Sequence, residues 1–146
     1  MELEPRMELD LSLFGAEHVR RYRETGGAEG YLWNGVPTLI LTTTGRRSGL
    51  PRDTPLIYGD DGGTGVVIAS QGGAPTHPQW YLNLVADPQV RVQVEADRYT
   101  AVARTAEGAE RERLWRLMAA VWPSYDVYQQ RTDRIIPVVA LERTTR

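Results

Sequence analysis

Residues 41–58 read LTTTGRRSGLPRDTPLIY, and the fold of the chain can be worked out from this stretch. Threonine, leucine and isoleucine on either side favour extended backbone, whereas the glycines and the proline within residues 45–52 favour a turn. Apolar runs that flank such a connection are typical of an antiparallel hairpin. The stretch therefore predicts paired strands at residues 36–44 and 52–58.

The predicted turn also concentrates positive charge. Arg46, Arg47 and Arg52 lie close together in the chain, beside the hydroxyl of Ser48. A guanidinium offers paired, planar donors that match phosphate and carboxylate oxygens, and glycine lets backbone N–H groups turn toward the same ligand. The turn is therefore predicted to bind an anion; the alternative is that arginines in a turn are simply solvated.

Outward from the hairpin, short strands and helices follow one another. The valines of residues 90–94 alternate with polar residues, which indicates a half-buried strand, and apolar residues at helical spacing indicate helices. The expected elements are a helix at 12–25, strands at 36–44, 52–58 and 65–70, a helix through 80–85 capped by Thr76, strands at 90–94 and 99–104, a helix from a Thr105 cap to Trp122, a helix at 124–130 and a strand at 135–141.

Six short strands, joined mostly as hairpins and with inserted and flanking helices, predict an α+β fold built on a small antiparallel barrel. With 146 residues the chain is expected to form a single domain over residues 1–146. Residues 1–11 mix charge with scattered apolar side chains and are expected to form a loose N-terminal arm.

Composition excludes several classes of function. The formal charge of −2 and the lack of a long basic run argue against a nucleic-acid partner. With no cysteine, disulfides and thiolate metal sites are excluded, and a reducing cytoplasm is compatible. The acidic start does not resemble a secretory signal, and no apolar run is long enough for an integral membrane segment.

Catalysis by the chain's own nucleophiles or by a metal is disfavoured. His18 and His77 are the only imidazoles, neither has the spacing of metal ligands, and both are expected at the surface or in loops. The remaining option is chemistry supplied by a cofactor, which the arginine turn would anchor by an anionic tail. Gly72 and Gly73 would let the backbone approach its planar ring, and aromatic residues would enclose a substrate.

Several motifs in sequence order resemble the deazaflavin-dependent nitroreductase family, which includes F420H2-dependent quinone reductases. They are residues 41–52, 70–73, 80–84, 123–125, 128–129 and 132–137, so the likeness covers about residues 30–143. The resemblance implies a split β-barrel that binds coenzyme F420, an 8-hydroxy-5-deazaflavin with a phosphodiester and an oligoglutamate tail. It also implies hydride transfer from the reduced coenzyme to a small electrophilic acceptor, such as a quinone, a nitro compound or a conjugated enone.

The resemblance also implies roles for individual residues. The phosphate and tail carboxylates would be held by Arg46, Arg47, Ser48 and Arg52. The deazaflavin head would meet the backbone of Ser70, Gln71, Gly72 and Gly73, with Trp80 and Asn83 beside it. The acceptor pocket would be shaped by Trp122, Tyr125 and Tyr128, where a tyrosine hydroxyl could donate to a developing oxyanion.

Some interpretations stay open at this stage. Many family members carry lysine at the position of Gln71, so one cofactor contact is in doubt, and Trp80 could belong to the core. Asp133 and Arg134 are expected to form a structural ion pair.

Two alternative functions stay open. One is a split-barrel oxidoreductase that uses flavin mononucleotide, and the other is a non-catalytic carrier or sensor of an anionic cofactor or haem. Open barrel edges make a homodimer plausible.

Overall fold

The computed structural model describes residues 10–144, and within this part eight strands form one antiparallel sheet. The strand order is β1-β2-β6-β7-β8-β5-β4, and β3 pairs with β2 as well. The strands are β1 (Leu32–Trp33), β2 (Val36–Thr44), β3 (Pro51–Ile57), β4 (Gly59–Asp61), β5 (Thr64–Ile68), β6 (Gln89–Val94), β7 (Asp97–Thr105) and β8 (Val138–Arg143).

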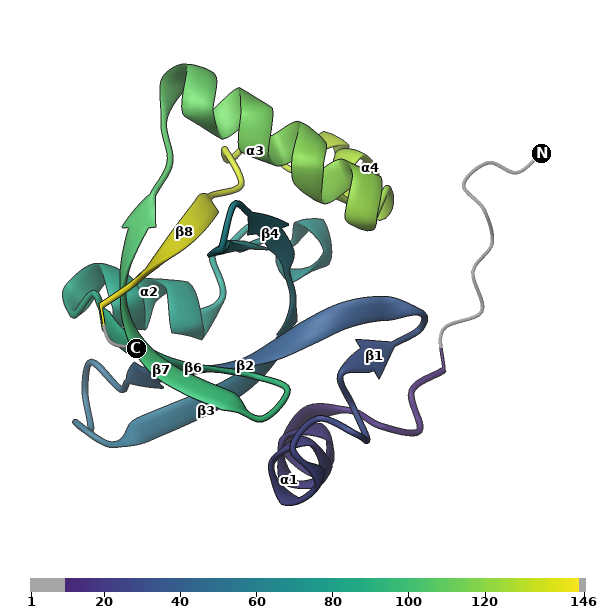
Figure 1. Cartoon of the computed structure of the whole chain (residues 1–146). Coiled ribbons are helices and arrows are strands. Elements are labelled where there is room, and N and C mark those ends of the chain that lie inside the picture. The colour runs from purple at the N-terminus through teal and green to yellow at the C-terminus, as the bar shows by residue number, and fades with distance from the viewer. Residues whose placement is uncertain (1–9, 145–146) are drawn as a thin grey trace.

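Four α-helices surround the curled sheet. Figure 1 shows α3 (Gly108–Val121) and α4 (Ser124–Gln130) together at one end, and α1 (Gly15–Thr25) at the opposite end. The short α2 (Gln79–Ala86) lies at the side and follows a 3-10 turn, η1 (Gln71–Gly73). The predicted α+β antiparallel barrel is therefore confirmed. No helix in the described part is long and apolar enough to cross a membrane.

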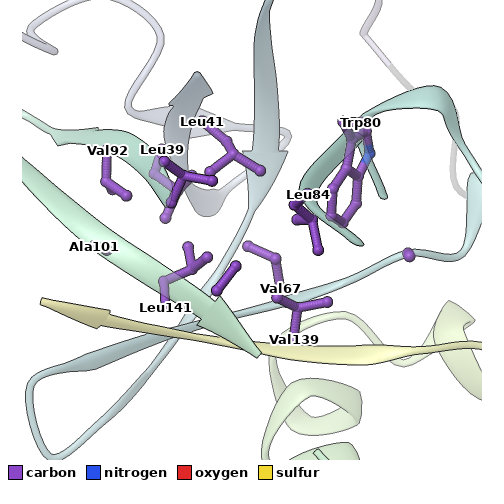
Figure 2. Packing of buried hydrophobic residues seen from close by; sticks show 12 residues of the cluster. Leu39, Leu41, Val67, Trp80, Leu84, Val92, Ala101, Val139 and Leu141 are labelled. Carbon is purple, nitrogen blue, oxygen red and sulfur yellow. The ribbon is translucent and has the colours of Figure 1, made fainter. Parts of the chain in front are cut away.

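Strand β5 separates two hydrophobic cores. Val67 packs with Leu39, Leu141 and Trp80 inside the barrel, and Figure 2 shows the side chains of α2 pointing into this space. Its neighbour Val66 faces the other way, against the helices α3 and α4. Because alternate residues of a strand point to opposite faces, the continuous apolar run of β5 fills both cores.

The helix α1 is fixed to the sheet by a buried tyrosine. Tyr22 has no exposed surface, and its hydroxyl donates to the carbonyl oxygen of Thr38 at 2.9 Å and accepts from the Glu95 amide at 2.8 Å. His18 on the same helix is only 3% exposed, and its Nε2 donates to the Gly30 carbonyl at 2.8 Å. The prediction that both histidines lie at the surface or in loops is wrong for His18, because it lies on the sheet-facing side of α1.

The hairpin strands agree with the sequence-based expectation, whereas other details differ. Strand β2 covers the predicted residues, and β1 and β4 add two strands too short to give a sequence pattern. Thr105 does not cap α3, because it still pairs with Val139 as part of β7. Thr76 does not cap α2 either, since the helix begins after Pro78 without a side-chain cap. Residues 1–9 of the predicted N-terminal arm lie outside the described residues.

Candidate functional site

The turn between β2 and β3 is closed by its own backbone. The Gly45 amide donates to the Leu50 carbonyl and the Gly49 amide to the Gly45 carbonyl, each at 2.8 Å. A side chain at position 45 would place its Cβ 2.6 Å from the Ser48 Oγ, and Gly49 has a φ of +73°. A side chain at 45 would therefore displace the Ser48 hydroxyl, and the backbone conformation favours glycine at 49.

Arg46 is anchored by the first turns of α2. Its Nη1 donates to Asn83 Oδ1 and its Nη2 to Gln79 Oε1, both at 2.8 Å, and its backbone amide also reaches Asn83 Oδ1 at 3.2 Å. Asn83 in turn donates to the Thr43 hydroxyl at 3.3 Å. All these partners are neutral, so they orient the guanidinium and leave its charge uncompensated.

Arg47 and Arg52 are exposed and make no hydrogen bond or ion pair with another described residue. Asp53, the carboxylate that lines the same cavity among the described residues, is already engaged, because Arg23 donates to its Oδ1 at 3.0 Å and the Thr42 hydroxyl at 2.6 Å. These side chains border a cavity of about 440 Å³, which we call the arginine cavity. It is lined by Gly45, Arg46, Arg47, Ser48, Arg52, Asp53, Thr54, Gln79, Trp80 and Asn83.

A second cavity of about 440 Å³, the aromatic cavity, is also lined by Trp80. Thr54 and Trp80 line both cavities, so the two are adjacent. Trp80 is only 8% exposed and therefore contributes to the core as well. The lining residues of the aromatic cavity are Phe14, Gly15, His18, Trp33, Thr38, Thr54, Pro55, Leu56, Ile57, Ile68, Ser70, Gln71, Gly72, Pro78, Trp80, Trp122, Tyr125 and Tyr128.

Trp122, Tyr125 and Tyr128 form an aromatic wall of this cavity, in which one tyrosine hydroxyl is hydrogen-bonded and the other is not. Trp122 Nε1 donates to the Tyr128 hydroxyl at 3.3 Å, and the rings of Tyr125 and Tyr128 meet edge to face at 6.0 Å. The Tyr125 hydroxyl has no hydrogen-bond partner among residues 10–144. Burial, with a smaller contribution from Tyr128, raises the pKa of Tyr125, so its hydroxyl keeps its proton and can act as a donor.

The glycine pair after β5 serves two different purposes. Gly73 has a φ of +85°, and an added Cβ would lie 2.7 Å from the Tyr128 carbonyl oxygen, so this residue lets the loop press against α4. Gly72 has a φ of +64° with open space around it, and Gln71 has a φ of +47°. Ser70, Gln71 and Gly72 border the aromatic cavity, whereas Gly73 borders neither cavity.

Arg134 is a residue whose role the sequence did not reveal. The expected ion pair with Asp133 is wrong: the guanidinium instead bonds to Ser70, Ala74 and their neighbours in the loop before α2. Gln79 was missed too, although its position one helical turn before Asn83 was the signal that both face the same side. No cluster of three or more metal-ligating side chains occurs in the described residues.

Comparisons with known proteins identify one matching protein family. Residues 15–143 match a protein family described as F420H(2)-dependent quinone reductase. An F420H(2)-dependent quinone reductase of Mycobacterium tuberculosis is 39% identical over 130 residues, which cover 86% of this chain and 87% of that protein.

Two solved structures are similar as well. An F420-H2 dependent reductase superposes with a TM-score of 0.69 at 43% identity, covering 73% of this chain and 94% of the other. A chain described as a domain-swapped dimer superposes with a TM-score of 0.72 at 38% identity, covering 86% of this chain and 92% of the other.

Proposed function

The chain belongs to the F420H(2)-dependent quinone reductase family, and we propose on this premise that it is an oxidoreductase that uses reduced coenzyme F420 to reduce small electrophilic acceptors. Quinones are the acceptors named for the family. Nitro compounds and conjugated enones belong to the proposal because they share the electrophilic centre that accepts a hydride.

The donor set of the arginine cavity fits an anionic cofactor tail. Arg47 and Arg52 carry charges that no described carboxylate compensates, and the neighbouring Asp53 is held by Arg23. Charged donors of this kind suit phosphate and carboxylate groups. We therefore assign the phosphodiester and the glutamates of F420 to Arg46, Arg47, Ser48 and Arg52. This juxtaposition of uncompensated guanidiniums with an aromatic cavity is the observation that carries the proposal.

The planar head of the cofactor is assigned to the junction of the two cavities. Trp80 lines both cavities there, Asn83 lines the arginine cavity, and Ser70, Gln71 and Gly72 line the aromatic cavity. Gly72 keeps side-chain bulk away from the rim, because it has no side chain and adopts left-handed backbone there. Gln71 lines the aromatic cavity with a neutral amide, so the charge that a lysine would add at this position is absent.

Reduced F420, when bound, supplies a hydride. The part left to the chain is to orient the acceptor, exclude water and stabilise negative charge on the acceptor's oxygen. Tyr125 is suited to the last task, because burial keeps the proton on its Oη and no described residue engages it. Trp122 and Tyr128 complete the wall, and the hydrogen bond between them fixes both rings.

The test is anaerobic titration of the purified protein with oxidised F420, followed by turnover of F420H2 with benzoquinones, naphthoquinones and nitroarenes. We expect saturable binding and protein-dependent oxidation of F420H2 that requires an acceptor. Binding without acceptor-dependent oxidation would instead indicate a carrier or sensor. Tight binding of flavin mononucleotide in preference to F420, visible in the different absorption of the two ring systems, would indicate the flavin alternative.

We also propose that the protein forms a homodimer and is located in the cytoplasm. Among residues 10–144, strand β3 pairs only with β2, so its outer edge offers unpaired backbone groups, and Ile135 is 71% exposed. Light scattering after gel filtration should give twice the monomer mass. The cysteine-free composition is compatible with the cytoplasm.

A further inference from the structure

The connection between β5 and α2, residues 69–78, serves both cavities. Its first half contributes Ser70, Gln71 and Gly72 to the aromatic cavity. It then leads directly into α2, which contributes Gln79, Trp80 and Asn83 to the arginine cavity. The position of this connection therefore sets how the two cavities lie relative to one another.

One guanidinium holds the connection in place. Arg134 Nε donates to the Ala74 carbonyl at 2.8 Å, and Nη2 donates to the Ser70 carbonyl at 2.7 Å. Nη1 donates to the Ala69 carbonyl at 3.2 Å and to His77 Nδ1 at 2.9 Å. No carboxylate takes part. Within the described chain, every hydrogen bond from this guanidinium therefore goes to the same loop.

The hydrogen bonds from Arg134 to this loop, which we call the clamp, lie where the loop meets the aromatic wall. Arg134 follows α4, the helix that carries Tyr125 and Tyr128, and Gly73 of the clamped loop packs on the Tyr128 backbone. Arg131 adds a hydrogen bond from Nη1 to the Gly72 carbonyl at 3.3 Å. A shift of the loop would therefore change its distance from the tyrosines.

We propose that Arg134 is a positioning residue that preorganises residues 69–77 for the cofactor and fixes their spacing from the acceptor wall. This inference rests on the proposed function for the identity of the ligand, F420. A loop already held in its bound conformation binds more tightly, because less conformational freedom is lost on binding.

The chemistry of the clamp explains why arginine is needed. A guanidinium is planar and presents five donors in a rigid fork, which can span acceptors on several residues. A lysine ammonium keeps the charge but radiates its three donors from a single atom. His77 takes part only when neutral, since a protonated Nδ1 cannot accept; its pKa is lowered by burial and by the Arg134 charge, which favours the neutral form.

The experiment compares Arg134→Lys with the matched control Arg116→Lys, an exposed arginine of α3 that makes no hydrogen bond or ion pair with another described residue. Hydrogen exchange of the ligand-free protein measures how often the loop opens, because the Gly73 and Ala74 amides donate to the carbonyl oxygens of Ser70 and Gln71. We expect these amides to exchange about tenfold faster in Arg134→Lys, with the control unchanged.

The second readout is the affinity for F420, expected to fall about tenfold in Arg134→Lys, together with a lower kcat for a quinone. Unchanged loop exchange and unchanged F420 affinity in a folded Arg134→Lys protein would overturn the inference. If that variant does not fold, Arg134→Gln, which is neutral and keeps only two N–H donors, takes its place, and unchanged loop exchange in that variant overturns the inference equally.

The exchange measurement separates this inference from the proposed function. A wild-type protein that fails to bind F420 would defeat the proposed function, while the exchange of the loop would still show whether Arg134 holds it. Asp133→Asn should leave exchange and affinity unchanged, because Asp133 is exposed and forms no ion pair with Arg134.

Discussion

At the scale of single residues, the site is defined by which charges are already compensated. Arg46 is oriented by the neutral amides of Asn83 and Gln79, and Asp53 is held by Arg23. Arg47 and Arg52 have no partner within residues 10–144. The turn therefore presents net positive charge to a ligand, even though the whole chain is slightly acidic.

Replacing Arg52 by alanine is expected to weaken F420 binding about tenfold, equivalent to about 1.4 kcal/mol. The loss reflects one exposed charge-assisted contact with the anionic tail, so it should shrink as salt is added. Isothermal titration at low and high ionic strength measures both effects. Arg116→Ala is the control, and equal affinities for wild type and Arg52→Ala would contradict the assignment.

Replacing Tyr125 by phenylalanine is expected to lower kcat for quinone reduction about a hundredfold while leaving F420 affinity unchanged. The variant keeps the ring in the wall and removes only the hydroxyl that no described residue engages. Steady-state kinetics together with F420 titration checks this split. Tyr81→Phe is the matched control, because the Tyr81 hydroxyl bonds to Thr105 outside both cavities. A loss of F420 affinity in Tyr125→Phe would place this hydroxyl at the cofactor instead.

At the scale of secondary structure, local sequence patterns are sufficient to predict the main strands but not the residues at which the helices begin. The hairpin and the alternating valines of β6 were predictable because each depends on a few neighbouring residues. Thr76 does not cap α2, because the helix begins only after the extended Pro78. Thr105 does not cap α3, because it pairs with β8. Tertiary contacts of this kind leave no local signature.

The two glycines of η1 give a paired test of the contact between this turn and α4. Gly73→Ala is expected to destabilise the protein by about 1–3 kcal/mol, because it combines left-handed backbone with a clash against the Tyr128 carbonyl. Gly72→Ala should be milder, since its backbone is also left-handed but its surroundings are open. Urea denaturation measures both, and equal losses would mean that backbone conformation alone, and not the contact with α4, requires Gly73.

At the scale of the whole molecule, the site forms where segments distant in sequence meet. The arginines of the turn are neighbours in the chain, and Tyr125 and Tyr128 share a face of one helix, so each group was predictable. Their arrangement around Trp80, and the clamp from Arg134, depend on how the fold brings η1 against α4 and places Trp80 at the border of both cavities. The resemblance to a known family supplied the link between these groups that local patterns could not.

The clamp also makes global stability depend on pH. The pKa of His77 is lowered from its ordinary value of 6.5 by burial and by Arg134. The unfolded chain therefore binds a proton at His77 more readily than the folded chain, and stability falls as pH drops below this value. We expect a lower thermal midpoint at about pH 5.5 than at about pH 7.5, and a smaller difference in His77→Gln. A midpoint that rises on acidification would contradict this sign.

The most direct measurement of the central claim is a crystal structure of the protein with F420 bound. The account predicts the phosphodiester and glutamate carboxylates within hydrogen-bond distance of Arg47 and Arg52, and the deazaflavin ring between Trp80 and the loop of residues 70–73. Electron density for the ring outside the two joined cavities, with the arginine cavity filled only by solvent, would contradict it.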